Sequence, residues 1–249
     1  MRRVITAVLV ALAGSLATRT ARAQFPPQKL QNLKVFPADI PVRTLIDTMA
    51  SFTRALGVRC TYCHVGEEGQ PLSSYDFPSD QKPEKGKARE MLRMVGAINR
   101  EYLTKLAARR TPPINVACAT CHRGVTEPRP LQQVVLNAYD AAGADSAEAL
   151  YRALRTRYYG RAAYDFGDVP LADVGAALRA RGKMADALRF YVLNTELAPT
   201  SPFAFRQAAE AQLAAGDTAA AIRSFQRALT INPNDRQARG ILDKLGAKP

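Results

Sequence analysis

The sequence of 249 residues predicts a mainly α-helical protein in two parts, and two observations support this. In the first part, the pattern C-x-x-C-H occurs twice, at residues 60–64 and 118–122. Each copy follows a helical stretch and a turn, and long loops lie around them. In the second part, from about residue 146, the chain is rich in alanine, and its turn, small and aromatic residues recur every 34 positions.

The first 23 residues have the composition of a cleavable signal peptide. Arg2 and Arg3 precede an apolar stretch at 4–17, and the small residues around Arg22 match a cleavage site, so the mature chain is expected to begin at Gln24. An uncleaved anchor is the less favoured alternative, because the apolar stretch is shorter than the roughly 20 residues of a membrane span. The prediction is a periplasmic protein with no transmembrane span in the mature chain.

The chain is strongly basic, with a formal net charge of +13. The predicted signal peptide contains four arginines and no acidic residue, so the mature chain would carry +9. A basic surplus favours nucleic acid, an anionic membrane surface or an acidic protein as partner. Because the sequence contains no nucleic-acid motif, we expect acidic redox proteins as partners.

Residues 24–130 are expected to form one domain, in which a unit of helix, turn and C-x-x-C-H occurs twice. Apolar residues at helical spacing predict a helix over 42–56, which Gly57 is expected to end. A polar loop at 66–85 follows the first motif. A second helix is predicted over 87–106, and a proline pair ends it shortly before the second motif.

Residues 131–145 are expected to be a linker, and 146–249 a helical domain of tetratricopeptide type. The 34-residue period relates Gly182 to Gly216, and the same offset relates Ala187 to Ala221, Tyr191 to Phe225, and Pro199 to Pro233. The period predicts repeats at 168–201 and 202–235 and a capping helix at 235–245. Because about three repeats are needed to bury such a core, either 146–165 supplies the missing helices or the repeats pack on the first domain.

All four cysteines and both histidines of the chain lie within the two motifs. C-x-x-C-H is the attachment motif of c-type haem. We therefore expect two covalently bound haem c groups. The covalent attachment residues are Cys60, Cys63, Cys118 and Cys121, and the proximal iron ligands are His64 and His122. The alternatives are a zinc site, which leaves both histidines unexplained, and two disulfides.

The second axial ligand of each iron is expected to be a methionine, because both histidines are already used, and this ligand raises the reduction potential. Met49 lies 11 positions before Cys60, on the helix that precedes the first motif. Met91 and Met94 lie on the helix before the second motif, three positions apart on one face. The spacing leaves both open as the ligand of the second haem.

Residues 40–124 resemble the cytochrome subunit of photosynthetic reaction centres, whose haem units consist of a methionine-bearing helix, a turn and C-x-x-C-H. The matching stretches are 49–64, 88–99 and 116–124. In that family the first methionine of the pair is the iron ligand, so the resemblance implies Met91 as the ligand and Met94 as a packing residue.

The chain also departs from that family. It has two haem motifs where well-known members carry four haems, and Lys105 stands where they place a distal histidine. That histidine serves a haem which this chain lacks, and the repeats are not part of the family's subunit. The resemblance therefore implies a smaller relative, without implying photosynthesis. Arg123, directly after the second motif, is expected either to pair with a haem propionate or to lie solvated on the surface.

The expected function is electron transfer between periplasmic or membrane redox partners, without enzymatic activity. Haems with histidine and methionine ligands have no open coordination position, and the repeats would dock a protein partner. One alternative is a peroxidase-like dihaem enzyme with one open haem site, which predicts a high-spin iron. The other is a tetratricopeptide scaffold with accessory haems, in which loss of 146–249 matters more than loss of Met49.

Overall fold

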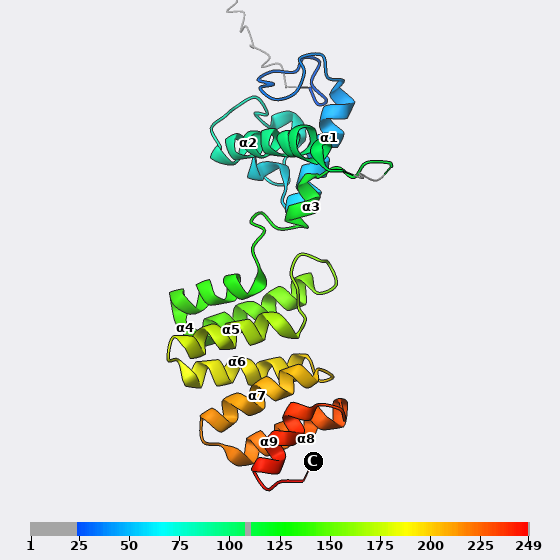
Figure 1. The fold of residues 1–249 in the computed structure, drawn as a ribbon. Helices are drawn as coiled ribbons and strands as arrows, with labels where there is room; N and C mark the ends of the chain where they lie inside the picture. The colour runs from blue at the N-terminus through cyan, green and yellow to red at the C-terminus, as the bar shows by residue number, and fades with distance from the viewer. Residues whose placement is uncertain (1–23, 108–110, 249) are drawn as a thin grey trace, which may run out of the picture. The chain divides into compact units, whose positions relative to one another are not determined.

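The computed structural model describes residues 24–107 and 111–248, so the predicted signal peptide lies outside the described residues. The contacts divide the chain into two compact units. The first comprises residues 1–50 and 59–109, and the second comprises 51–58 and 110–249. Apart from one isolated antiparallel bridge between Val65 and Asp76, the regular structure of the described residues is helical (Figure 1).

The first helix of the first unit is α1 (Val42–Leu56), and its bounds agree with the predicted helix. The last residues of α1, from position 51 on, belong to the second unit. Three short turns lie in this unit, η1 (Cys60–Tyr62), η2 (Leu72–Ser74) and η4 (Leu103–Lys105). Helix α2 (Pro83–Ala97) begins four residues earlier than predicted, with its proline in the first turn, where a missing N–H leaves no bond unmade. The helix then widens into the π-helical turn η3 (Ile98–Tyr102).

The second unit contains the short helix α3 and a series of longer helices that stack as successive hairpins (Figure 1). Their bounds are α3 (Cys118–His122), α4 (Leu131–Tyr158), α5 (Asp168–Ala180), α6 (Met184–Leu197), α7 (Pro202–Ala214), α8 (Thr218–Ile231) and α9 (Arg236–Lys244). The hairpins α5–α6 and α7–α8 confirm the two predicted repeats. The predicted capping helix is α9, and the Asp235 carboxylate caps it by accepting hydrogen bonds from the N–H groups of Gln237 and Ala238.

The repeated small and aromatic residues lie in the core of the helical hairpins. Ala187, Ala221, Tyr191 and Phe225 are all almost fully buried. Gly175 lies against the ring of Tyr191, and a β-carbon at this glycine would fall 2.7 Å from a ring carbon. The period in the sequence therefore marks the contacts that hold neighbouring helices together.

Residues 131–145, expected to be a linker, form the first part of α4. The helix breaks at Ala142 and Gly143, and the glycine takes a φ of +80°. Before the break, Leu131 and Val135 are buried at 2% and 0% exposure, in one cluster with Tyr151 and Leu171. The segment therefore belongs to the core of the helical repeats. Residues after the break, up to Tyr158, supply further helix, which is one of the two alternatives given for the missing helices of the repeats.

No helix in the described part of the chain has a stretch both long enough and apolar enough to cross a membrane.

Candidate haem-attachment sites

Each C-x-x-C-H motif is wound into a helical turn. In the first motif, the backbone N–H of His64 donates to the carbonyl of Cys60 at 2.9 Å. The second motif coincides with α3. Residues three and four positions apart lie on one face of such a turn. Both thiols and the imidazole of each motif therefore share a face, which attachment of one porphyrin to all three requires.

The imidazole of His64 is held through one ring nitrogen. Its Nδ1 lies 3.3 Å from the carbonyl oxygen of Phe77, and its ring meets the Phe77 ring edge-on at 5.0 Å between centroids. Because a carbonyl can only accept, Nδ1 carries the proton and Nε2 keeps a free lone pair. Burial, with the charge of Lys85, lowers the pKa of His64 and keeps it neutral, as an iron ligand must be.

His122 is held in the same way by a carbonyl of its own chain segment. Its Nδ1 lies 2.9 Å from the carbonyl oxygen of Val125. Arg123 and Gly124, with φ angles of +49° and +91°, turn the chain back so that this carbonyl reaches the ring. Ring nitrogens bonded to backbone carbonyls are the usual second shell of metal-ligating histidines. Both motif histidines therefore have the arrangement of a proximal ligand.

The guanidinium of Arg123 donates to backbone carbonyls of its own unit. Its Nε donates to Thr120 at 3.3 Å, and one terminal nitrogen donates to Ala162 at 3.4 Å. The side chain is therefore held against the chain, and pairing with a propionate stays a prediction.

The four cysteines are all free thiols, so neither disulfide of the alternative interpretation is formed. Burial raises the pKa of Cys63 and Cys118, which keeps both thiols protonated at neutral pH. Zinc binds thiolates rather than thiols, so this environment favours thioether formation over a zinc site. Among the described residues, no three or more cysteine, histidine or acidic side chains are grouped so that they could hold a metal ion.

The methionines predicted as distal ligands lie on α1 and α2. Met49 is half-buried and belongs to the first unit, together with Cys60, Cys63 and His64. Met91 and Met94 are exposed at 40% and 46%, and they also belong to the first unit. Residues 118–122 belong to the second unit. The assignment of Met91 to the second haem therefore rests on the sequence and stays a prediction.

The haem-bearing region buries few of its own side chains. Of the described residues between 24 and 125, only Ala55 and Val125 are buried. Large apolar side chains of this region, such as Tyr62 and Tyr102, are exposed at 41% and 63%. A porphyrin would supply the apolar core that this stretch of chain does not form from its own residues. The donor set and the packing of the region thus both fit haem.

The end of α1 meets the end of the second motif within the second unit. The N–H of Gly124 donates to the carbonyl of Ala55 at 2.8 Å. Gly57 ends the helix as predicted, with a φ of +67°. A β-carbon on Gly57 would overlap the Gly124 carbonyl group, falling 3.0 Å from its carbon and closer to its oxygen. Sequence reasoning missed this second role, because no short pattern reports a contact between residues so far apart.

The loop predicted at 66–85 is held around one lysine. Lys85 Nζ donates to the carbonyls of Phe77, Pro78 and Ser79 at 2.8, 2.9 and 2.8 Å. Next to it, Asp80 accepts hydrogen bonds from Lys34 and Asn32, and these bonds hold its pKa well below the usual range. Sequence reasoning did not single out Lys85, since a lysine on a polar helix end carries no distinctive signal.

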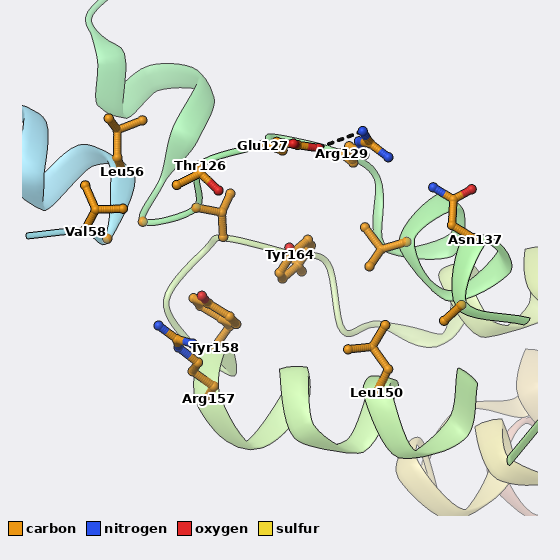
Figure 2. A pocket seen from close by; sticks show the side chains of 15 residues that line it. Leu56, Val58, Thr126, Glu127, Arg129, Asn137, Leu150, Arg157, Tyr158 and Tyr164 are labelled. Carbon is orange, nitrogen blue, oxygen red and sulfur yellow. Dashed lines mark ion pairs between the residues drawn. The ribbon is translucent and has the colours of Figure 1, made fainter. Parts of the chain in front are cut away.

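A cavity of about 650 Å³ lies beside the second motif (Figure 2). Apolar and aromatic side chains line much of it, including Leu56, Val58, Leu150, Tyr158 and Tyr164. Polar groups also line it: Arg129 pairs with Glu127 at 2.7 Å, and Arg157 stacks over the Tyr158 ring at 5.1 Å. Gly124 and Val125 line it as well, so its wall includes the residue that holds His122.

Comparison with known proteins shows what the haem-bearing part is similar to. Residues 21–141 match the profile of the family described as the photosynthetic reaction centre cytochrome C subunit. Cytochrome c-554 of Chloroflexus aurantiacus is 41% identical over 68 residues, which are 27% of this chain and 14% of that relative. The chain thus matches only a small part of the curated relative's length.

Several solved structures are similar to the chain over 47% of its length. The first tetratricopeptide domain of Spaghetti (RPAP3), bound to an HSP90 peptide, is 20% identical, with a TM-score of 0.32 and 87% of that domain covered. PcrH from Pseudomonas aeruginosa is 22% identical, with a TM-score of 0.29 and 83% covered.

The profile match begins before the first described residue and ends at 141, one residue before the break in α4. It contains both haem motifs, α1 and α2. The tetratricopeptide-like hairpins follow it. Residues 21–141 of the chain are therefore similar to the cytochrome c subunit of photosynthetic reaction centres.

Proposed function

We propose that this chain is an exported dihaem c-type cytochrome that transfers electrons between periplasmic or membrane redox partners and catalyses no reaction of its own. The observation that carries the proposal is that the two motif histidines make the same kind of hydrogen bond. Each is bonded through Nδ1 to a backbone carbonyl, which leaves Nε2 free for iron. Both motifs are equally equipped in this respect, which supports two haems rather than one.

In the proposed assignment, Cys60 and Cys63 would bind the first haem covalently, and His64 and Met49 would ligate its iron. Cys118 and Cys121 would bind the second haem, and His122 and Met91 would ligate its iron, with Met94 as the alternative to Met91. Bound haem would supply a one-electron iron couple, which is the chemistry of an electron carrier.

The chain's own residues hold this couple in a fixed environment. The carbonyls of Phe77 and Val125 fix the tautomer and the orientation of the two imidazoles. Because Nδ1 keeps its proton in both oxidation states, we expect electron transfer without proton uptake at the ligands. Two saturated irons leave no position for substrate, which is why electron transfer is preferred over a peroxidase-like reaction.

The partners are proposed from charge and from the repeats. The +9 charge expected for the mature chain favours an acidic redox protein. The helical hairpins offer a surface on which a protein partner could dock. Export would be shown by a mature amino terminus at Gln24 in protein isolated from the periplasm.

The experiment is an absorption spectrum of the oxidised and reduced periplasmic protein, with a pyridine haemochrome assay for the haem content. We expect two haems per chain, a near-infrared methionine-to-iron band and no high-spin signal. The double variant C118A/C121A should retain one haem and serves as the matched control. Fewer than two haems in the unmodified protein would contradict the proposal, and one high-spin iron would favour an enzyme and put Met91 in doubt first.

A further inference from the structure

The two proximal histidines differ in what else contacts the carbonyl that holds them. The Phe77 carbonyl, which accepts from His64 Nδ1 at 3.3 Å, also accepts from the Lys85 ammonium at 2.8 Å. The Val125 carbonyl accepts from His122 Nδ1 at 2.9 Å. No lysine or arginine in the described part of the chain donates to Val125.

The Lys85 ammonium is held next to the Phe77 carbonyl by burial and by several hydrogen bonds. Its side chain is 13% exposed, and its three N–H groups are used by three consecutive carbonyls, those of Phe77, Pro78 and Ser79. Asp80 offsets part of its charge at 3.3 Å, but Asp80 also pairs with Lys34 and Arg89. Asp76 also acts on Lys85, so two carboxylates stand against the three cations Lys85, Lys34 and Arg89, and a net positive charge remains next to the Phe77 carbonyl.

A carbonyl that accepts a charge-assisted hydrogen bond has less electron density to offer a second donor. The longer His64 bond agrees with this competition. A weaker bond at Nδ1 leaves the imidazole a poorer electron donor to iron, because such bonds raise the basicity of metal-ligating histidines. Poorer donation stabilises the reduced iron. The nearby positive charge favours the reduced iron as well, since reduction removes one positive charge.

We propose that Lys85 is a positioning residue that weakens the His64–Phe77 hydrogen bond and so sets the reduction potential of the first haem above that of the second. This inference rests on the proposed function, because it requires a haem at each motif. It gives the chain a direction: at equilibrium, an electron on the reduced protein is expected to reside at the first haem.

The test compares three variants of the full-length protein that carries its haems. Lys85→Gln removes the charge, and Lys85→Arg keeps it. Lys87→Gln is the matched control, because Lys87 lies on the same helix, is 75% exposed and pairs only loosely with Glu84 at 3.9 Å. Haem content is measured first on every sample, so that loss of a haem is recognised as failure of the proposed function.

The first readout is a spectroelectrochemical titration. In Lys85→Gln, the higher of the two potentials should fall, and the lower one should stay. The equilibrium constant for the electron on the first haem against the second should fall about tenfold, the effect of losing one hydrogen bond to a charged group. Lys85→Arg should stay close to the unmodified protein, as should Lys87→Gln.

The second readout is independent of the potentials. The chain has two histidines, so isotopically labelled histidine gives one Nδ1–H resonance for each in the reduced protein. The His64 resonance should shift toward a stronger hydrogen bond in Lys85→Gln, while the His122 resonance stays in place. A readout of this kind separates an effect on His64 from a general loss of structure.

The inference is overturned if Lys85→Gln leaves both potentials in place, if Lys87→Gln lowers the higher potential equally, or if the His64 resonance does not move. If Lys85→Gln does not take up two haems, the inference is tested instead by hydrogen exchange in the unmodified protein. In that protein the Nδ1 proton of His64 must exchange with solvent faster than that of His122, and the reverse order refutes the proposal.

Discussion

Gly57→Ala should destabilise the second unit by more than the loss of a glycine alone explains. Gly57 ends α1 with a φ of +67°, a conformation that L-residues with a side chain rarely adopt. A β-carbon there would also overlap the Gly124 carbonyl group, whose carbon would lie 3.0 Å away. The overlapping group is the backbone carbonyl of Gly124, and Gly124 also donates its N–H to the carbonyl of Ala55. The overlap can therefore be removed only if the end of α1 and the end of the second motif move apart.

The magnitude follows from two contributions. Alanine in a left-handed conformation costs about 1–2 kcal/mol, and overpacking against a fixed neighbour adds about 1–3 kcal/mol. The expected loss is therefore about 2–5 kcal/mol for Gly57→Ala. Gly124→Ala is a close control, because Gly124 also has a positive φ of +91° but a β-carbon there would meet nothing within 4 Å. The control should lose only the first contribution, about 1–2 kcal/mol.

The assay is urea unfolding of both variants with their haems, followed by the Soret absorption and by the far-ultraviolet circular dichroism. The free energy of unfolding should fall further for Gly57→Ala than for Gly124→Ala, and the slope with urea should be the same in both. Equal losses in the two variants would refute the reasoning, because they would show that the close approach of Gly57 to Gly124 contributes nothing beyond backbone strain.

Three further predictions concern the distal ligand and the helical repeats. Met49→Ala should convert one of two haems to high spin and halve the near-infrared methionine band, and an unchanged band would exclude Met49 as a ligand. Burial alone would raise the pKa of Glu148, but Arg189 and a second arginine outweigh burial and lower it below the reference value of 4.5. The unfolded state then binds more protons than the folded state as the solution is acidified, so the contribution of Glu148 to thermal stability should be full above about pH 4.5 and fall below it. Glu148→Gln should flatten this decline in a series of melting temperatures against pH. An equal slope in both proteins would contradict the assignment. Asp235→Ala removes the cap of α9 and the partner of Arg206, 2.9 Å away, and should lower the free energy of unfolding by about 2 kcal/mol in urea, whereas Asp235→Asn should recover the capping share.

Much of the fold could be predicted because it depends on local patterns. The apolar spacing of 42–56 and its terminal glycine predicted the bounds of α1. The 34-residue period predicted the two hairpins, because residues such as Ala187 and Ala221 recur at buried positions of the core. Cys60–His64 and its second copy predicted attachment chemistry, because two cysteines and a histidine stand at fixed spacing within one helical turn.

The features that could not be predicted depend on contacts between distant residues. Lys85 acquires its role from the path of the 77–79 backbone around it, and Gly57 from the approach of Gly124. The segment 131–145 was misread as a linker because it follows Pro128 and Pro130 and contains polar residues. The packing role of Leu131 and Val135 is evident only in the folded structure, where the helices of the repeats bury them.

The first part of α4 has a consequence for how the two modules of this chain can be exchanged. By sequence, residues up to 141 are part of the cytochrome family match. By packing, Leu131 and Val135 of that same stretch complete the core of the repeats, beside Tyr151 and Leu171. A gene fusion that cut at residue 141 would leave the repeats with an uncovered apolar end and the cytochrome with an unpartnered helix. The end of the family match, at residue 141, and the start of the folded repeat unit, at residue 131, therefore differ by the first part of α4. A transplant of the repeats is expected to fold only if it includes residues 131–141.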